Sequence, residues 1–349
     1  MKKYKKINSP LLKSLNLRNL FLIPISLALI IASVIAPKAT GSDVTKTRDF
    51  NGDGKEDILW RNSSCGINNS PTAICEKVVW LMNGINLAGD AGLPGAEKAW
   101  NIRGIADFNG DRKPDILWKK DGTNEYAIWL INGNNIIAGE VVSTVNLPWD
   151  QSSIGDFNGD GKADLLWRNI NTGENILWLM DGTKVIAGFN VPPVSDTLWS
   201  ISSSPDFNGD GRADILWRKN NETVIWLMNG NNLAEPASLP AQFGVARTGD
   251  FNGDGKADIL WRDNATGNNR LWLMNGTRRI ADLNVPSVPN PPWDIASIAD
   301  FDGNGRADIV WRTAAGDNYM WLMDSNNIIA EAFLLNVPSS WSIFLQDQH

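Results

Sequence analysis

The chain contains 349 residues, of which 43% are hydrophobic and 20% charged, and this balance predicts a folded protein with a large core. The single histidine, His349, excludes multi-histidine metal sites and argues against a Ser-His-Asp or Cys-His catalytic site. The formal net charge of -7 argues against a nucleic-acid partner, because phosphates require a basic surface.

The first 41 residues have the features of an export signal. They carry seven Lys and Arg residues and no acidic residue around an apolar run at residues 20–36. A charged start followed by a hydrophobic stretch is typical of a secretory signal peptide. An uncleaved membrane anchor is the alternative, since the run approaches the length that spans a bilayer. Both interpretations predict an exported protein, whether secreted, periplasmic or held at the cell surface, with residues 42–349 as one domain.

Cys65 and Cys75 are the only two cysteines and lie in one short segment. Because an exported protein permits disulfides, we expect a bond between them that staples a loop. A reactive dithiol is the alternative, but the segment lacks the Cys-x-x-Cys spacing and a nearby basic partner.

One unit recurs six times after the export signal. A nine-residue acidic string begins at Asp49, Asp107, Asp156, Asp206, Asp250 and Asp300, at intervals of 58, 49, 50, 44 and 50 residues. An Ile-Leu-Trp-Arg run and a Trp-Leu-Met-Asn-Gly run follow most of these strings. This order predicts four strands per unit, with a two-residue Asn-Gly or Asp-Gly turn before the fourth. The period and the strand number indicate an all-β fold, a β-propeller of six four-stranded blades.

All 17 tryptophans fall on repeat positions. The first strand of a repeat is expected to start at Trp100, Trp149, Trp199, Phe243 or Trp293. The second strand is expected to hold Trp60, Trp118, Trp167, Trp217, Trp261 or Trp311, and the third Trp80, Trp129, Trp178, Trp226, Trp272 or Trp321. Periodic tryptophan on strands favours a core between blades over a stacking platform for sugars or bases.

The last tryptophan, Trp341, indicates how the ring closes. Ser42 stands where the first repeat would need its aromatic residue, whereas Trp341 begins a strand-like segment with no repeat after it. The simplest inference is that the carboxyl-terminal strand completes the first blade. In the alternative, residues 43–48 form that strand and the tail starts a seventh, partial blade, so that the ring stays partly open.

The six acidic strings, called the acidic loops below, are predicted metal sites. Oxygen side chains occupy their positions 1, 3, 5 and 9, and alternate oxygens on a curled loop converge on one point, which suits Ca²⁺. Three crowded carboxylates repel one another without a cation, and this favours a metal over a plain Asp/Asn/Gly turn. The predicted ligands are Asp49, Asn51, Asp53, Asp57, Asp107, Asn109, Asp111, Asp115, Asp156, Asn158, Asp160, Asp164, Asp206, Asn208, Asp210, Asp214, Asp250, Asn252, Asp254, Asp258, Asp300, Asp302, Asn304 and Asp308.

The acidic loops differ from an EF-hand and from one another. An EF-hand needs Glu at position 12, where every copy here has Trp, so the Asp at position 9 is expected to close the site. Up to six Ca²⁺ ions are expected. The loop at residues 107–115 should bind most weakly, because Arg112 replaces a turn glycine and Pro114 stiffens the chain.

The DFNGDG string, the Asp three residues later and the Ile-Leu-Trp run together resemble the FG-GAP/VCBS repeats of integrin-α-like β-propellers. The resemblance covers residues 49–349. It implies Ca²⁺ in the hairpin loop between the first two strands of each blade, on positions 1, 3, 5 and 9. Two features depart from the pattern: the second acidic loop, and an insertion that separates Trp60 from Trp80 by 20 residues where other copies have 9 to 11.

Antiparallel strands should place the acidic loops on one face of the ring, and the variable connectors and the stapled insertion on the other. Variable loops on a rigid scaffold are where recognition is usually built. We therefore expect a monomeric, calcium-stabilised, non-catalytic binding or adhesion module for a glycan or an extracellular protein, with no organic cofactor. The alternatives are a polysaccharide hydrolase or lyase, although no acid pair is singled out by its spacing, and a purely structural surface protein.

Overall fold

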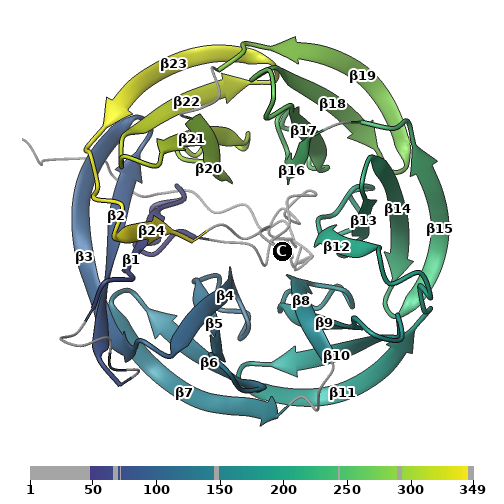
Figure 1. Ribbon diagram of the computed structural model, residues 1–349, viewed down its shortest axis with the longest axis horizontal. Helices are drawn as coiled ribbons and strands as arrows, with labels where there is room; N and C mark the ends of the chain where they lie inside the picture. Colours follow the sequence, from purple (N-terminus) through teal and green to yellow (C-terminus); the bar gives the residue numbers. More distant parts are fainter. Residues whose placement is uncertain are drawn as a thin grey trace, which may run out of the picture. The chain divides into compact units, whose positions relative to one another are not determined.

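Six groups of four antiparallel strands make up the part of the chain that the computed structural model describes, residues 48–65, 70, 72–144, 149–242, 244–288 and 293–344. These residues all belong to the unit Ala39–His349 and include no helix, so no helix among them could cross a bilayer. The six sheets are arranged as blades around a central axis (Figure 1). The predicted six-bladed β-propeller is confirmed. The predicted export signal, residues 1–41, lies outside the described residues.

Each blade has a first strand near the axis and a fourth strand on the outer rim (Figure 1). The first strands are β24 (Trp341–Ile343), β4 (Trp100–Ala106), β8 (Trp149–Gly155), β12 (Ser200–Ser203), β16 (Val245–Gly249) and β20 (Trp293–Ala299) for blades 1 to 6. The second strands are β1 (Ile58–Asn62), β5 (Asp115–Lys120), β9 (Asp164–Asn169), β13 (Ile215–Lys219), β17 (Asp258–Arg262) and β21 (Asp308–Thr313). The third strands are β2 (Ile74–Asn83), β6 (Glu125–Asn132), β10 (Asn175–Asp181), β14 (Glu222–Asn229), β18 (Asn269–Asn275) and β22 (Asn318–Asp324). The fourth strands are β3 (Asn86–Glu97), β7 (Asn135–Thr144), β11 (Lys184–Val191), β15 (Asn232–Leu239), β19 (Arg278–Val285) and β23 (Asn327–Leu334).

The carboxyl-terminal strand closes the ring. β24 pairs antiparallel with β1, with Trp60 opposite Ile343 and Asn62 opposite Trp341, and so completes blade 1. The inference drawn from Trp341 is therefore confirmed, and the alternative of a seventh, partial blade is wrong. Two expected strand starts move slightly: β12 begins one residue after Trp199, and β16 begins at Val245, while Phe243 lies outside the described residues.

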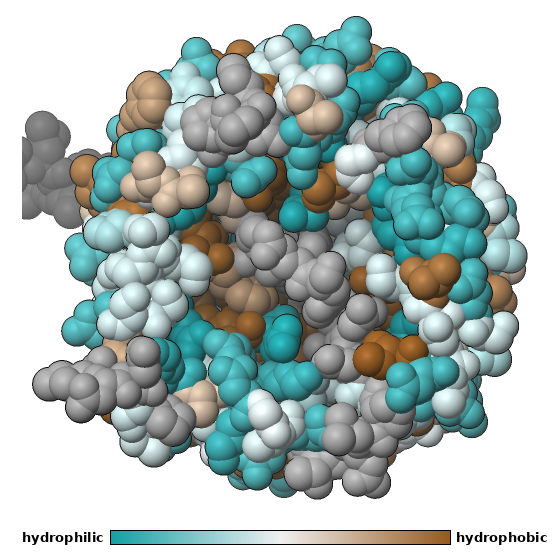
Figure 2. Space-filling model, in the orientation of Figure 1, coloured by the Kyte–Doolittle hydropathy of each residue, from teal (hydrophilic) through white to brown (hydrophobic). Residues whose placement is uncertain are grey.

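Burial explains the strand sequences. The second strands are buried on both faces, as in β9, and this matches their unbroken Ile-Leu-Trp runs. The fourth strands alternate between exposed and half-buried residues, as in β23, because one face of each rim strand meets water. On the face shown in Figure 2, hydrophilic residues cover most of the rim, and hydrophobic residues gather toward the central hollow.

Six hydrophobic clusters fill the gaps between neighbouring blades. Every second-strand tryptophan is at most 2% exposed, and its ring centroid lies 4.8–5.1 Å from that of the third-strand tryptophan of the same blade. The expectation that periodic tryptophan forms a core between blades is confirmed for these positions. The first-strand tryptophans are only half-buried.

The arginine that follows the second-strand tryptophan joins each of four blades to the next one. The guanidinium carbon lies 4.8–4.9 Å from the ring centroid of the next blade's second-strand tryptophan in the pairs Arg168–Trp217, Arg218–Trp261, Arg262–Trp311 and Arg312–Trp60. A cation over an indole face is attracted by the negative face of the ring, and a planar guanidinium also stacks on it. The same arginines donate to carbonyls of the connector that leads to the next blade, so one side chain fixes both the interface and the loop.

Blades 1 and 2 contact the next blade through other residues than an arginine stacked on tryptophan. Arg61 donates to the carbonyls of Lys98 and Trp100 in the connector to blade 2, while Lys77 of β2 lies 5.0 Å from the Trp118 ring. Between blades 2 and 3, Tyr126 meets the Trp167 ring edge-on. The arginine stack is therefore absent from two of the six interfaces in the described structure.

We expect Arg262→Met to lower the free energy of unfolding by about 2–4 kcal/mol, because it leaves the buried Val288 carbonyl and the partly buried Trp293 carbonyl without their donor. The matched control is Arg270→Met, which removes an exposed ion pair with Asp282 and should cost less than about 1 kcal/mol. Thermal denaturation measures both, and equal losses would contradict the role of Arg262.

Lys77 predicts a pH dependence of stability. Burial lowers the pKa of Lys77 to about 7, and the nearby charge of Arg61 adds to this effect. Between pH 7 and 9 the unfolded chain keeps a proton that the folded protein has lost, so the free energy of unfolding rises with pH. Relative to Lys77→Met, the wild type should gain at most about 1.4 kcal/mol per pH unit over this range. A constant difference between the two proteins would show that the folded protein keeps the Lys77 proton.

Candidate metal centres

Five acidic loops join the first and second strands of their blade, and the loop of blade 1 leads into β1 alone, because β24 supplies the first strand of that blade. The acidic loops lie beside the third-to-fourth turn of a neighbouring blade. In blade 3, the Gly182 N–H of this turn donates to the Phe108 carbonyl in the loop of blade 2, at 2.8 Å. The corresponding bond joins Gly276 of blade 5 to Phe207 of blade 4, also at 2.8 Å. The acidic loops and the third-to-fourth turns therefore share one face of the ring, as the antiparallel order predicts.

The Asp at position 1 organises the loop around its carboxylate. In the loop of blade 3, Oδ1 of Asp156 accepts the N–H of Gly159 at 2.6 Å, and Oδ2 accepts the N–H of Gly161 at 2.7 Å. Gly159 and Gly161 have φ values of 78° and 85°, a region that glycine adopts without strain. The two glycines thus let the chain curl tightly enough for its amides to face the carboxylate.

The side chains at positions 3 and 5 bond within the loop. In blade 3, Oδ1 of Asn158 accepts the Asp160 N–H at 2.8 Å, and Oδ1 of Asp160 accepts the Lys162 N–H at 2.9 Å. The residue at position 5 is exposed in all six loops. These oxygens point along the turn and keep lone pairs that face solvent.

The Asp at position 9 is fully buried in every loop, with 0% exposure. In blade 3, Oδ2 of Asp164 accepts the Phe157 N–H at 3.1 Å, and Oδ1 accepts the Met180 N–H at 3.0 Å. Met180 lies where the pairing of β10 with β11 shifts by one residue, so its N–H turns toward the carboxylate. The same two bonds occur in all six blades. Position 9 therefore ties the acidic loop to a bulge on the third strand.

Burial gives these carboxylates an unusual affinity for protons. It raises the pKa of Asp164 to about 7 and that of Asp308 to about 8, and the neighbouring loop carboxylates raise both further. The two backbone N–H groups act in the opposite direction without cancelling the effect. Burial therefore disfavours the charged form of the position-9 carboxylate unless a positive charge lies beside it.

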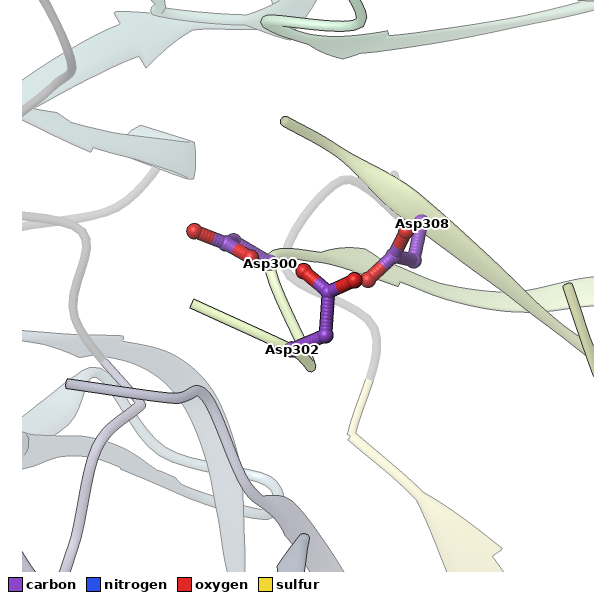
Figure 3. Close-up of side chains that lie close together, drawn as sticks. All are labelled: Asp300, Asp302 and Asp308. Atoms are coloured by element: carbon purple, nitrogen blue, oxygen red, sulfur yellow. The ribbon is translucent and has the colours of Figure 1, made fainter. Parts of the chain in front are cut away.

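The sixth loop brings three carboxylates together. The ligating oxygens of Asp300, Asp302 and Asp308 lie within 4.8 Å of one another, and they form the only such acidic trio among the residues that the structure describes. Figure 3 shows the Asp302 carboxylate between those of Asp300 and Asp308. The other loops keep the same backbone hydrogen bonds but have Asn at position 3, so they offer no carboxylate there.

The donor atoms of the loops fit a hard divalent cation. All are carboxylate or amide oxygens, and a carboxylate oxygen that accepts one N–H keeps a second lone pair for a metal. Burial raises the pKa of the position-9 carboxylate, so a cation bound beside it would favour its charged form. Asp300, Asp302 and Asp308 would hold Ca²⁺ in the sixth loop, and the residues at positions 1, 3, 5 and 9 would hold it in the others. Such an ion would neutralise the loop charge and fix the turn.

Backbone hydrogen bonds link the acidic loops around the ring. The N–H at position 8 donates to the position-1 carbonyl of the preceding loop in five cases, at 2.7–2.8 Å: Glu56 to Asp300, Ala163 to Asp107, Ala213 to Asp156, Ala257 to Asp206 and Ala307 to Asp250. In the second loop, position 8 is Pro114, which has no N–H to donate. The chain of bonds is therefore interrupted between blades 1 and 2.

The second loop keeps the shape of the others under strain. Arg112 takes φ = 62°, and its N–H donates to Oδ2 of Asp107 as the glycine does elsewhere. A side chain in this left-handed region costs about 1 kcal/mol relative to glycine. The weaker calcium affinity of this loop stays a prediction, now with a local cause.

The structure joins Cys65 and Cys75 in a disulfide with a Cα–Cα distance of 5.0 Å, which confirms the expected bond.

The sequence analysis missed two features: the bulge that supplies an N–H to position 9, and the arginine that stacks on the next blade's tryptophan. The Ile-Leu-Trp-Arg repeat was the available signal for the arginine, because an arginine follows five of the six second-strand tryptophans.

Fold and loops together define a six-bladed β-propeller with an acidic hairpin loop in each blade. The sequence profile of the FG-GAP-like repeat matches residues 49–118, 107–167, 206–261 and 250–311. The chain therefore belongs to the family of proteins with FG-GAP-like repeats.

No curated protein sequence matches the chain. The comparison with solved structures concerns the fold alone. A chain in the crystal structure of a nidogen/laminin complex is similar, with a TM-score of 0.51 at 11% identity, covering 83% of this chain and 97% of that one. Raptor of Chaetomium thermophilum gives a TM-score of 0.48 at 10% identity, and 86% of this chain then spans only 25% of Raptor.

Arg112→Gly should raise the free energy of unfolding by about 0.5–1 kcal/mol, because glycine adopts the left-handed turn without strain. Asn220→Gly is the matched control: Asn220 has φ = 52°, but asparagine tolerates this region, so its gain should be smaller. Thermal denaturation without calcium compares the two. Equal gains would contradict strain at Arg112.

Proposed function

We propose that this protein is an exported, calcium-stabilised binding or adhesion module whose ligand is a glycan or an extracellular protein. The observation that carries the proposal is the way the connectors opposite the acidic loops are fixed. Arg312 donates to the carbonyls of Val337 and Trp341, both at 2.9 Å, in the connector between β23 and β24. Arg168 holds the connector before β12 in the same manner, through the Val194 carbonyl at 2.9 Å.

Fixed connectors suit recognition because they lose their conformational entropy during folding, so that binding a ligand does not have to order them. Their sequences differ from blade to blade, so the described connectors present different loops on one scaffold. The disulfide between Cys65 and Cys75 lies toward the same face and is compatible with an oxidising compartment outside the cytoplasm.

Calcium supports this role as a structural ion. A cation bound to an acidic loop would neutralise buried charge and hold the turn that carries the bonds to the neighbouring blade. The expected task of calcium is therefore to stiffen the ring rather than to contact the ligand.

The binding role is tested with the full chain on immobilised glycans and on defined extracellular proteins, each with Ca²⁺ and with a chelator. Capture that survives extensive washing and weakens with the chelator supports the proposal. Failure to capture any glycan or protein under both conditions, by a protein shown to be folded, would contradict it.

Calcium should raise the melting temperature of the chelator-treated protein, because a ligand of the folded state stabilises it by about 2.7 kcal/mol per site at a hundredfold excess over Kd. Asp302→Ala should reduce this gain by removing one carboxylate of the sixth loop. The matched control is Asp282→Ala, whose side chain pairs with Arg270 on the surface and should leave the gain unchanged. No thermal shift with calcium in the wild type would refute the metal assignment.

A further inference from the structure

The interface between blades 1 and 2 differs from the other five in several independent ways. Pro114 interrupts the backbone bonds between acidic loops, and Lys77 replaces the arginine on the neighbouring tryptophan. The glycine at position 4 of a loop packs against the position-7 Lys or Arg of the next loop, 3.2–3.4 Å from where a Cβ would stand, at five interfaces. A Cβ at Gly52, which faces blade 2, would meet nothing within 4 Å. This interface is thus the least tightly joined one on the loop face.

The same interface contains a cavity of about 330 Å³ at its other end. Blade 1 contributes Ile74, Ala96 and Glu97, and blade 2 contributes three tryptophans, Glu140 and Val141. Cavities of roughly 300–1,000 Å³ are the usual size for small ligands. The cavity extends from the hydrophobic cluster between the two blades, since Ala96 and Trp118 belong to both.

The insertion in the first repeat builds the wall on the blade 1 side. β2 has 10 residues, whereas the other third strands have 7 or 8. β3 has 12 residues, whereas the other fourth strands have 8 or 10. The added length pairs Ile74 with Glu97 and Cys75 with Ala96. The disulfide to Cys65 holds this extension at its base. The insertion therefore lengthens the β2–β3 hairpin, and this disulfide-bonded extension forms the blade 1 wall of the cavity.

Glycines let the cavity walls approach closely. At Gly95, a Cβ would collide with the Ile74 side chain that covers it. At Gly139, a Cβ would lie 3.0 Å from the Trp129 ring, so glycine allows the ring to lie against the rim strand. These contacts set the position of Trp129 in the cavity.

The lining chemistry selects a ligand. None of the lining residues is basic, and Glu97 supplies a carboxylate on the blade 1 wall, so an anionic ligand would be repelled. Amino groups already lie over two of the tryptophans: Lys77 Nζ is 5.1 Å from the Trp129 centroid and Lys120 Nζ is 5.6 Å from that of Trp100. A cationic ligand would meet the charge of Lys120. What the cavity still offers is apolar ring surface and the Glu97 carboxylate as an acceptor.

We propose that this cavity binds a ring of a neutral saccharide, with its C–H face against Trp100 and Trp129 and a hydroxyl donating to Glu97. The carboxylate of Glu140 is turned toward blade 3, because Glu140 pairs with Ile128 on that face and its Oε2 accepts the Thr183 hydroxyl at 2.9 Å. The inference deepens the proposed function, on which it rests, by naming one ligand class and one site at the edge of the connector face.

The test uses the full chain in calcium on a printed panel of neutral, uronate-bearing and amine-bearing oligosaccharides. Binding to neutral members above the two charged groups is expected. The best neutral member is then titrated against the protein with tryptophan fluorescence as the readout, because three tryptophans line the cavity. Preference for uronate-bearing members would overturn the proposal.

Matched variants locate the site. Val141 at the cavity and Ile329 on β23 are 57% and 55% exposed, so an arginine at either place should leave folding intact. Val141→Arg should weaken binding at least about tenfold by covering the cavity, and Ile329→Arg should leave it unchanged. Glu97→Gln, which keeps the shape, should weaken it as well, whereas Glu140→Gln, on the blade 3 face, should leave it unchanged.

The outcomes separate the inference from the proposed function. Equal binding by the wild type and Val141→Arg would overturn the cavity assignment while the binding role stands. Capture of a defined protein with no neutral saccharide bound would likewise overturn the saccharide but keep the role. Absence of both saccharide and protein capture by the folded protein would overturn the inference and the proposed function together.

Discussion

At four of its six blade interfaces, the ring depends on a stack between two flat side chains from different blades. A guanidinium of one blade lies on the buried indole of the next, and its remaining N–H groups reach carbonyls of the connector between them. Both partners are needed in the interior: the arginine could not be buried without acceptors, and the indole gives it an apolar face that still attracts a cation. Because one residue serves both contacts, the packing of the blades and the course of the connectors are set together.

A second layer of order lies on the opposite face and is electrostatic. The carboxylate of Asp214, like the others at position 9, bridges its loop to the third strand, and burial raises its pKa to about 8. Backbone hydrogen bonds join five pairs of neighbouring acidic loops, and Pro114 interrupts the series between blades 1 and 2. The two faces of the ring therefore have different physical bases, one apolar and cationic, the other anionic.

The sequence allowed the repeat architecture to be predicted, because period, turn glycines and tryptophans are local signals. Even the closure by β24 followed from the position of Trp341. The arginine contacts between blades were not predictable, since nothing in the repeat states which face of Trp217 is free for Arg168. The partner of Asp164 was hidden for the same reason: Met180 is 16 residues away, and its bulge has no sequence signature. The candidate metal ligands were identifiable by spacing, whereas their burial and existing hydrogen bonds required coordinates.

The closure by β24 also has a consequence for how the chain acquires its fold. Blade 1 consists of three strands near the start of the propeller and one that ends at Ile343, so β1 lacks its inner neighbour until residues 341–343 have been synthesised. During that interval the edge of β1 offers unpaired backbone groups to any other strand. The disulfide and the long β2–β3 hairpin lie in this same blade and stabilise its outer strands before β24 is available to pair with β1. A disulfide in blade 1 thus suits the order in which the strands are synthesised as well as the final contacts.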